Sequence, residues 1–468
     1  MIRITFTLLL FCFSIYLKAQ PLKISENGRF LVKSDNTPFF WLGDTGWEMI
    51  HRLNKEEAAY YLKNRAGKGF NVIMTVVLSE MNGITVPNAE GNLPLIDKDP
   101  EKPNEAFFAH LDYIVKQAKL NGLYLGLVPT WGAYLDDKKH PLFDNVPLFL
   151  DEKKAAAFGK FMGARYKDAD NIIWIAGGDR SANGHEKIWE AMIKGIRSGG
   201  AKQLLAYHPT GGESSADYPE LASLLDFNMY QSGHERIANS NYARIKTDYE
   251  HSPAKPIIDA EPNYEDGPIG FNPANGRFND FNVRNASYWS VFAGGFGINY
   301  GHNSVWQMYE PGKHKPIVWA ISGWKKALEF PGSNQLQYLK KLVLSRPYLS
   351  RIPDQSITDQ PQTERTNHIQ VTRDGTAGSN DASYIMIYYP YLSNIAIKTT
   401  VIAAKQLHAW WFNPRTGAAT DIGILENKGL FSVPYAKQIK ENQAGPDWVL
   451  VIDDALRNYP APGTGSFE

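Results

Sequence analysis

The 468-residue sequence has a single cysteine, Cys12, and no net charge, because 49 lysines and arginines balance 49 aspartates and glutamates. One cysteine cannot close an internal disulfide, which excludes a disulfide-rich scaffold. A neutral chain without a Lys/Arg-rich run lacks the electrostatic surface that binds nucleic acid. The histidines show neither an HExxH motif nor a short His-x-His spacing, which disfavours a zinc site. We therefore expect no disulfide, no nucleic-acid partner, no metal and no other cofactor.

An apolar run near the N-terminus, Ile4–Leu17, follows Arg3 and precedes Lys18, Ala19 and Gln20. This pattern is typical of a secretory signal peptide cleaved after Ala19, and the run is short for a transmembrane helix. Removal of residues 1–19 leaves about 450 residues, without a cysteine and without an integral membrane segment. We expect export to the periplasm, the cell surface or the extracellular space.

Aromatic residues are abundant, with 12 Trp, 24 Tyr and 23 Phe, and eight short apolar runs recur along the first three quarters of the chain. Apolar runs bounded by Gly, Pro or polar residues are typical of buried parallel strands. They span Pro38–Leu42, Phe70–Leu78, Leu123–Pro129, Ile172–Ala176, Leu204–Tyr207, Phe227–Tyr230, Pro256–Ala260 and Gly297–Tyr300. Helical stretches follow most of them, and Asn54 is a candidate N-cap of the first. Eight such units predict an α/β fold, a (β/α)₈ or TIM barrel.

The pattern changes near residue 350, where helical stretches stop and short alternating runs begin. These runs span Tyr384–Tyr389, Ile395–Ile397, Leu407–Phe412 and Trp448–Ile452. They predict a C-terminal antiparallel β-sandwich, and the segment Leu22–Pro38 predicts a small hairpin. We therefore expect the signal peptide at residues 1–19, the barrel with its N-terminal hairpin at 20–355, and the sandwich at 356–468.

Two carboxylates come directly after strongly apolar strands: Asp179 follows NIIWIAGG, and Glu261 follows KPIIDA. In a (β/α)₈ barrel the active site lies where the strands end, and two facing carboxylates are what a glycosidase needs. Two glycines before Asp179 permit close backbone approach. Two structural alternatives remain open. Asp179 could be a helix N-cap, and Glu261 could be half of a salt bridge.

Other polar and aromatic residues near strand ends are candidate sugar contacts. Asp44 could bind hydroxyl groups or serve a turn, and Glu80 is the leading substitute for Asp179 as the acid. His208 and His302, with His234, are candidates for hydrogen bonding or for structure. Aromatic rings cover the apolar faces of sugars in carbohydrate sites, and any one of them could instead be packing. These aromatic candidates are Trp131, Tyr230 and Trp306, with Tyr300.

Four segments together resemble the apiosidase-like catalytic domain of glycoside hydrolase family 140. They are Pro38–Trp47 (PFFWLGDTGW), Ala58–Thr75 (AAYYLKNRAGKGFNVIMT), Trp174–Asp179 (WIAGGD) and Ile257–Pro262 (IIDAEP). The stretch Trp410–Gly417 (WWFNPRTG) is similar to the β-sandwich that follows this domain and carries a collagen-binding label. The resemblance implies removal of apiose from the pectin rhamnogalacturonan II by an Asp and a Glu, and it maps these roles onto Asp179 and Glu261.

The expected function is that of an exported glycoside hydrolase that removes a terminal sugar, apiose, from plant pectin. Asp179 is expected to be the general acid/base and Glu261 the nucleophile of a retaining mechanism. One alternative is a glycosidase of the same fold acting on another sugar, such as an arabinofuranoside. The other is a non-catalytic protein that binds glycan or collagen through its C-terminal sandwich.

Overall fold

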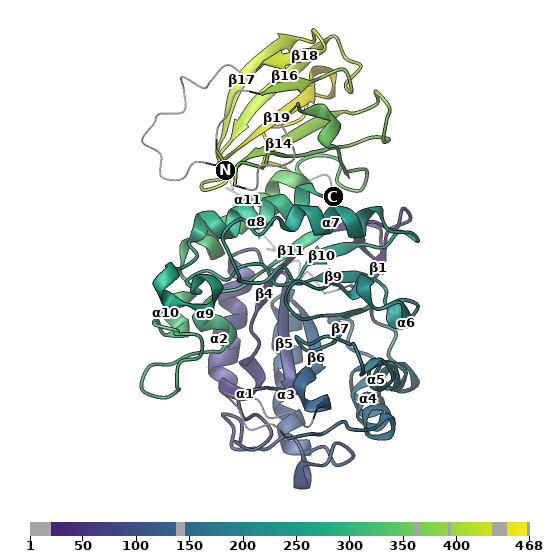
Figure 1. Cartoon of the computed structure of the whole chain (residues 1–468), viewed down its shortest axis with the longest axis vertical. Coiled ribbons are helices and arrows are strands. Elements are labelled where there is room, and N and C mark those ends of the chain that lie inside the picture. The colour runs from purple at the N-terminus through teal and green to yellow at the C-terminus, as the bar shows by residue number, and fades with distance from the viewer. Residues whose placement is uncertain (1–19, 137–145, 360–365, 392–394, 433–446, 466–468) are drawn as a thin grey trace, which may run out of the picture.

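The computed structural model describes residues 20–136, 146–359, 366–391, 395–432 and 447–465. The expected signal peptide, with Cys12, lies outside the described residues. Figure 1 shows two parts stacked along the long axis of the molecule, a helix-covered barrel and a smaller β-sheet region. The chain runs once through the barrel and then enters the sheet region.

Eight parallel strands form the barrel, in the order β8-β7-β6-β5-β4-β11-β10-β9. The hydrogen bonds between β8 and the segment before β9 bring the two ends of this sheet together. There the N–H of Asp226 donates to the carbonyl of Leu205, and the N–H of Leu205 donates to the Asp226 carboxylate at 2.8 Å. The predicted TIM barrel is therefore confirmed. The strands are β4 (Trp41–Thr45), β5 (Val72–Leu78), β6 (Tyr124–Thr130), β7 (Ile172–Ala176), β8 (Leu205–Tyr207), β9 (Asn228–Tyr230), β10 (Ile257–Asp259) and β11 (Gly297–Tyr300).

Helices alternate with these strands and cover the outside of the barrel (Figure 1). Asn54 caps the first long one in a capping box: its side chain accepts from the N–H of Glu57 at 2.9 Å, and Glu57 accepts from the N–H of Asn54. Among the described residues no helix combines the length and the apolar character needed to cross a membrane. The helices are α1 (Met49–Arg52), α2 (Lys55–Gly67), α3 (Glu105–Leu120), α4 (Glu152–Tyr166), α5 (Glu186–Ser198), α6 (Pro219–Ala222), α7 (Asn241–Glu250), α8 (Asp280–Phe292), α9 (Asn303–Trp306), α10 (Trp324–Ala327) and α11 (Pro331–Leu344).

The start of the barrel differs from the sequence-based expectation. The predicted strand Pro38–Leu42 is divided between two elements: Pro38–Phe39 is β3 of a small antiparallel sheet with β1 (Leu22–Ile24) and β2 (Leu31–Lys33). The barrel strand β4 begins at Trp41 and continues to Thr45. Asp44 therefore lies within a strand rather than in the loop that follows it, which changes the direction of its side chain.

The C-terminal region is an antiparallel sandwich of a six-stranded sheet, β12-β13-β14-β19-β16-β17, and a two-stranded sheet, β15-β18. Successive side chains of a strand point to opposite faces. In β14 Tyr384, Met386 and Tyr388 join the core of the barrel, whereas Ile385 and Ile387 join the core of the sandwich. The strands are β12 (Ile352–Pro353), β13 (Gln370–Arg373), β14 (Tyr384–Tyr389), β15 (Ala396–Lys398), β16 (Gln406–Phe412), β17 (Ala419–Glu426), β18 (Leu430–Ser432) and β19 (Trp448–Asp454).

Buried polar contacts join the sandwich to α8 of the barrel. Arg284 donates two hydrogen bonds of 2.9 Å to Asp447, in a bidentate pair that excludes water. Tyr288 stacks on Tyr388 with 4.7 Å between ring centroids. Removing one partner from a buried ion pair is strongly destabilising, so this contact ties the two parts into one unit.

Candidate active site

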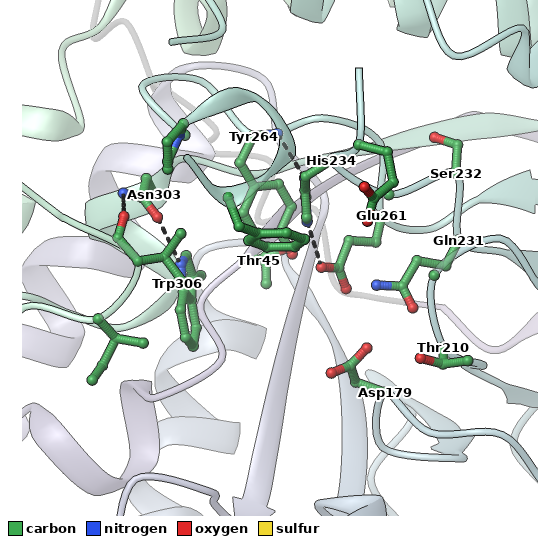
Figure 2. Close-up of a pocket in the computed structure, with 18 of the residues that line it drawn as sticks. Thr45, Asp179, Thr210, Gln231, Ser232, His234, Glu261, Tyr264, Asn303 and Trp306 are labelled. Atoms are coloured by element: carbon green, nitrogen blue, oxygen red, sulfur yellow. Dashed lines mark hydrogen bonds and ion pairs between the residues drawn. The ribbon is translucent and has the colours of Figure 1, made fainter. Parts of the chain in front are cut away.

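A cavity of about 1240 Å³ opens at the carboxyl ends of the barrel strands. Its lining includes residues at or beyond the ends of five strands, which Figure 2 shows in part. They are Thr45 of β4, Glu80 after β5, Asp179 after β7, Tyr230 of β9 and Glu261 after β10. This is the end of a (β/α)₈ barrel at which active sites are found.

The loop after β7 presents Asp179 to the cavity through an unusual backbone. Gly177, Gly178 and Asp179 all have positive φ, of 94°, 55° and 61°. A Cβ on Gly177 would lie 2.1 Å from the carbonyl oxygen of His208, so only glycine fits there. Asp179 is a non-glycine residue in the left-handed region, which costs free energy and is concentrated at functional sites. The helix α5 begins only at Glu186, so the N-cap alternative for Asp179 is excluded.

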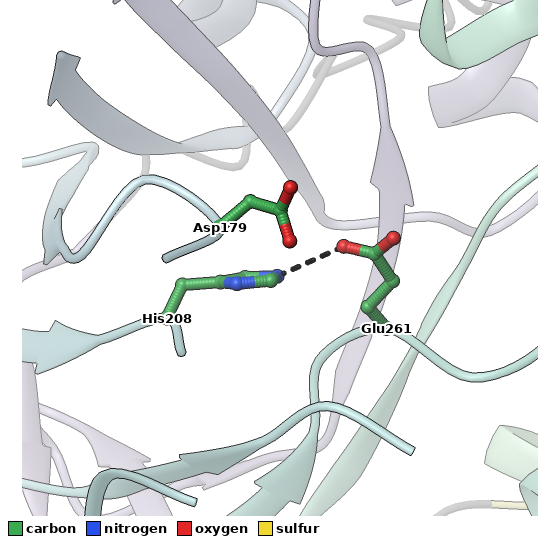
Figure 3. Close-up of side chains that lie close together, drawn as sticks. All are labelled: Asp179, His208 and Glu261. Atoms are coloured by element: carbon green, nitrogen blue, oxygen red, sulfur yellow. Dashed lines mark ion pairs between the residues drawn. The ribbon is translucent and has the colours of Figure 1, made fainter. Parts of the chain in front are cut away.

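Glu261 lies opposite Asp179 and contacts two histidines, His208 (Figure 3) and His234 (Figure 2). Its Oε1 is 3.0 Å from Nε2 of His234, and its Oε2 is 3.3 Å from Nε2 of His208. The Tyr264 N–H donates to Nδ1 of His234, so the proton of a neutral His234 is on Nε2 and points at Glu261. His208 faces an acceptor on both sides, because its Nδ1 is 2.9 Å from the carbonyl of Pro209. Two acceptors favour the doubly protonated imidazolium.

These surroundings separate the pKa values of the two carboxyl groups. Burial, followed by the negative charge of Glu261, raises the pKa of Asp179 to about 6. Burial also acts to raise the pKa of Glu261, but hydrogen bonds from His208 and His234 and their charge outweigh it and lower this pKa to about 2. Burial lowers the pKa of His208, and the interaction with Glu261 outweighs that effect and raises it. Two neighbouring carboxyl groups with divergent pKa values define an acid and a base.

Asp179 is held by the next residue in the chain. Arg180 donates from Nη1 to Oδ2 of Asp179 at 2.8 Å, and its guanidinium lies 4.8 Å from the ring of Trp131. Trp131 is fully buried and is not part of the cavity lining. Trp131 thus lies against the guanidinium of Arg180 and outside the cavity lining, and not in the position of the sugar platform that the sequence led us to expect.

Three of the predicted contacts do line the cavity: Glu80, Tyr230 and Trp306. Burial, followed by the charges of Glu48 and Asp179, raises the pKa of Glu80 well above its ordinary value. Glu80 therefore keeps its proton to a higher pH than an exposed glutamate does, and in its protonated form it can donate a hydrogen bond to an oxygen. His208 lies beneath the lining and reaches the site through Glu261.

Asp44 and His302 lie away from the cavity. The side chain of Asp44 points to the outside of β4, where Oδ2 forms an ion pair with Nε of Arg65 at 2.7 Å and accepts a hydrogen bond from the hydroxyl of Tyr61 at 2.6 Å. Alternation along the strand brings the next residue, Thr45, into the cavity instead. His302 is fully buried, caps α9 by accepting from the N–H of Ser304 at 3.0 Å, and packs on Phe330. Neither of these residues makes the substrate contact that the sequence predicted.

One cluster of potential metal ligands occurs among the described residues: Asp179, His208 and Glu261, whose nearest ligand atoms all lie within 4.8 Å of one another. The ion pair between His208 and Glu261 uses the nitrogen that a metal would need. An imidazolium has no free lone pair, so protonation of His208 works against a metal and favours an acid–carboxylate pair.

The cavity lining also contains residues that the sequence did not predict. His234 is not one of them, because it follows a strand end as His208 does and both are predicted as hydrogen-bonding or structural residues. Arg180 follows Asp179 directly, and Tyr264 packs on His234 with 4.6 Å between ring centroids. Phe271 and Trp319 lie in loops without periodicity, and no sequence signal singles them out.

The barrel, the cavity at its strand ends and the facing acid pair define a glycoside hydrolase. A structure described as a glycoside hydrolase is 34% identical to this chain, with a TM-score of 0.84 over 94% of this chain and 98% of the other. A crystal structure of a glycoside hydrolase family 5 protein from Bacteroides vulgatus ATCC 8482 is also 34% identical, with a TM-score of 0.85 over 96% of each chain. No curated protein matches the chain.

The particular family follows from the family models. Residues 25–350 match the model described as "Apiosidase-like, catalytic domain", and residues 352–453 match one described as "Putative collagen-binding domain of a collagenase". The chain therefore belongs to the apiosidase-like family, and the resemblance noted from the sequence is confirmed.

Proposed function

We propose that the protein removes terminal apiose from the pectic polysaccharide rhamnogalacturonan II, with Asp179 as general acid/base and Glu261 as nucleophile. The observation that carries the catalytic assignment is the pair of facing carboxyl groups in the cavity, Glu261 held by His208 and His234 and Asp179 within 4.8 Å of it. The pKa values support it, because burial and the charge of Glu261 raise that of Asp179 to about 6 and, against the opposing effect of burial, the histidines lower that of Glu261 to about 2. The proposal of apiose rests on the family to which residues 25–350 belong.

The reaction would proceed in two steps. In the first, a carboxylate oxygen of Glu261 attacks the anomeric carbon, the bond to the leaving oxygen breaks, and Asp179 gives its proton to that oxygen. The products are a glycosyl ester of Glu261 and the shortened glycan. In the second step Asp179 takes a proton from water, the water oxygen bonds to the anomeric carbon, and the ester to Glu261 breaks.

The spacing of the acids supports retention of configuration. A carboxylate oxygen of Asp179 and one of Glu261 lie within 4.8 Å of each other. Retaining glycosidases hold their carboxyl groups about 5–5.5 Å apart, whereas inverting enzymes leave about 6.5–9.5 Å for a water molecule. The anomer first formed, followed by NMR, tests this part: an inverted product would exclude Glu261 as a nucleophile.

The experiment that tests the function is incubation of wild type and Asp179→Asn with rhamnogalacturonan II, followed by chromatography of the released monosaccharides. We expect apiose from the wild type alone. Release of arabinose from arabinofuranosides, without apiose, would replace the sugar and keep the mechanism. Equal release by the Asp179→Asn protein would remove Asp179 from the mechanism and make Glu80 the acid to test next.

The two ends of the chain complete the proposal. Residues 1–19 have the pattern of a signal peptide, so we propose export and a glycan substrate outside the cytoplasm. For the sandwich we propose a supporting role, because the Tyr384, Met386 and Tyr388 face of β14 is buried against the barrel. Soluble collagen would then show no binding to the intact protein in a pull-down assay.

A further inference from the structure

The cavity is larger than one terminal sugar requires. Its volume of about 1240 Å³ exceeds the range of about 300–1,000 Å³ typical of small-molecule sites. The acids are its deeper part, since the side chains of Asp179 and Glu261 are 29% and 13% exposed. Two aromatic residues of the same lining, Trp319 and Phe271, are 55% and 46% exposed. The cavity thus has an acidic floor and an aromatic rim.

Hydrogen bonds from neighbouring side chains fix the backbone around Trp319. Asn303 donates to the carbonyl of Val318 at 2.8 Å, and Arg277 donates to the carbonyl of Trp319 at 2.7 Å. The amide of Gln307 donates to the carbonyl of Ile317 and accepts from its N–H. These bonds hold Val318 and Trp319 at φ values of 46° and 50°.

Two consecutive non-glycine residues in the left-handed region are strained, and such a conformation persists only where its surroundings impose it. The strained backbone of this loop lowers the stability of the fold, and it keeps the indole ring of Trp319 exposed to water at the edge of the cavity. Burial of the ring in the core would be the more stable use of a tryptophan.

Phe271 lies on a second loop, between β10 and α8, and close to Glu261. Its ring packs edge-on against His234 with 5.7 Å between centroids, and His234 contacts Glu261. Its φ is 56°, again left-handed. Arg277 joins the two loops, because it donates to the backbone carbonyl of Asp266 as well as to that of Trp319.

We infer that Trp319 and Phe271 form an aglycone subsite, which stacks on the sugar rings of the glycan from which the terminal sugar is cut. The inference rests on the proposed function and extends it to the leaving group. The terminal sugar must reach Glu261 at the floor, so the remaining glycan extends across the rim. Exposed aromatic rings offer the flat apolar surface that the C–H face of a pyranose covers. The substrate class is therefore an oligosaccharide or polysaccharide rather than a glycoside with a small aglycone.

The test compares two substrates that carry the same sugar: rhamnogalacturonan II and methyl apioside, whose aglycone is too small to stack on the rim. Trp319→Ala and Phe271→Ala should each lower the ratio of kcat/KM on the polysaccharide to kcat/KM on the methyl glycoside about tenfold, since loss of a buried aromatic contact costs at least that much affinity. Ile321→Ala is the matched control: Ile321 is 63% exposed, two residues from Trp319, and is not part of the lining. A Trp319→Ala ratio equal to that of the control would overturn the subsite.

Binding is measured separately, so that failure of the subsite and failure of the proposed reaction can be told apart. Glu261→Gln protein, with and without Trp319→Ala, is titrated with rhamnogalacturonan II oligosaccharides in a calorimeter. Weaker binding by the double variant supports the subsite, even where the wild type releases a sugar other than apiose. Equal affinity of the two proteins, or no binding by either, overturns it.

Discussion

Asp44 in β4 and Glu261 after β10 are both carboxylates at the end of a barrel strand, and the structure gives them opposite surroundings. Asp44 is closed off by Arg65 and Tyr61 from helix α2, on the outer side of its strand. Glu261 is held by His208 and His234 and still faces the cavity. Burial and a cationic partner are common to both sites. What separates them is the side of the strand from which the partner comes, and this decides whether an acid stabilises the fold or remains available to a substrate.

The largest expected difference between the two sites is in activity. Glu261→Gln removes the proposed nucleophile and should lower kcat/KM by at least about 10³-fold. Asp44→Asn should leave most of the activity per folded molecule, because Asp44 does not reach the cavity. Assays on folded protein, quantified by circular dichroism, make the comparison. Near-normal activity of Glu261→Gln would show that Glu261 is not the nucleophile.

The second expected difference is in stability, and here the substitution of Asp44 has the large effect. Asp44→Asn leaves Arg65 buried without its charge partner, which should lower the free energy of unfolding by about 3–5 kcal/mol. The control is Glu190→Gln, in the exposed pair of Glu190 with Lys194, for which we expect at most about 1 kcal/mol. Urea denaturation measures both. Equal small losses would mean that the pair of Asp44 and Arg65 has no structural role.

The third comparison, with a smaller expected effect on kcat/KM and on its pH profile, is between two buried histidines that follow barrel strands, His208 and His302. His208→Gln should lower kcat/KM by between about tenfold and a hundredfold through misplacement of Glu261. It should also move the acid limb of the pH profile upward, because the pKa of Glu261, about 2 in the wild type, loses the influence that lowers it. His302→Gln should leave the pH profile unchanged, since His302 caps α9. A shift of the acid limb in both variants would show that it does not depend on the contact between His208 and Glu261.

The smallest effect concerns the alkaline limb. The proposed acid must be protonated, so kcat/KM should fall as the pH rises through about 6, the pKa of Asp179. The charge of Arg180 lowers that pKa, and its removal in Arg180→Gln should raise it. The midpoint of the limb should then move upward by less than about one pH unit. Activity that rises instead of falling as the pH passes through about 6 would mean that Asp179 acts only as a base.

The sequence by itself determined the barrel, the sandwich and the positions of the two acids. Seven of the eight apolar runs each overlap one barrel strand, the first run is divided between β3 and β4, and Tyr384–Tyr389 is β14 with the same bounds. Asn54 capped its helix as predicted. Local patterns suffice here because strand periodicity, capping and turn chemistry act over a few residues.

Tertiary structure decided what the acids contact. The first barrel strand begins and ends three residues later than predicted. In the observed strand the side chain of Asp44 points toward α2, and that of Thr45 lines the cavity. His208, His234 and Glu261 converge although 53 residues separate the first from the last, and only closure of the barrel sets the distances between them. Trp131, predicted to contact sugar, is buried under Arg180, whereas Trp319 is held in water by bonds from Asn303 and Arg277. Composition and spacing carry no record of such long-range contacts, because they depend on which loops meet once the barrel is closed.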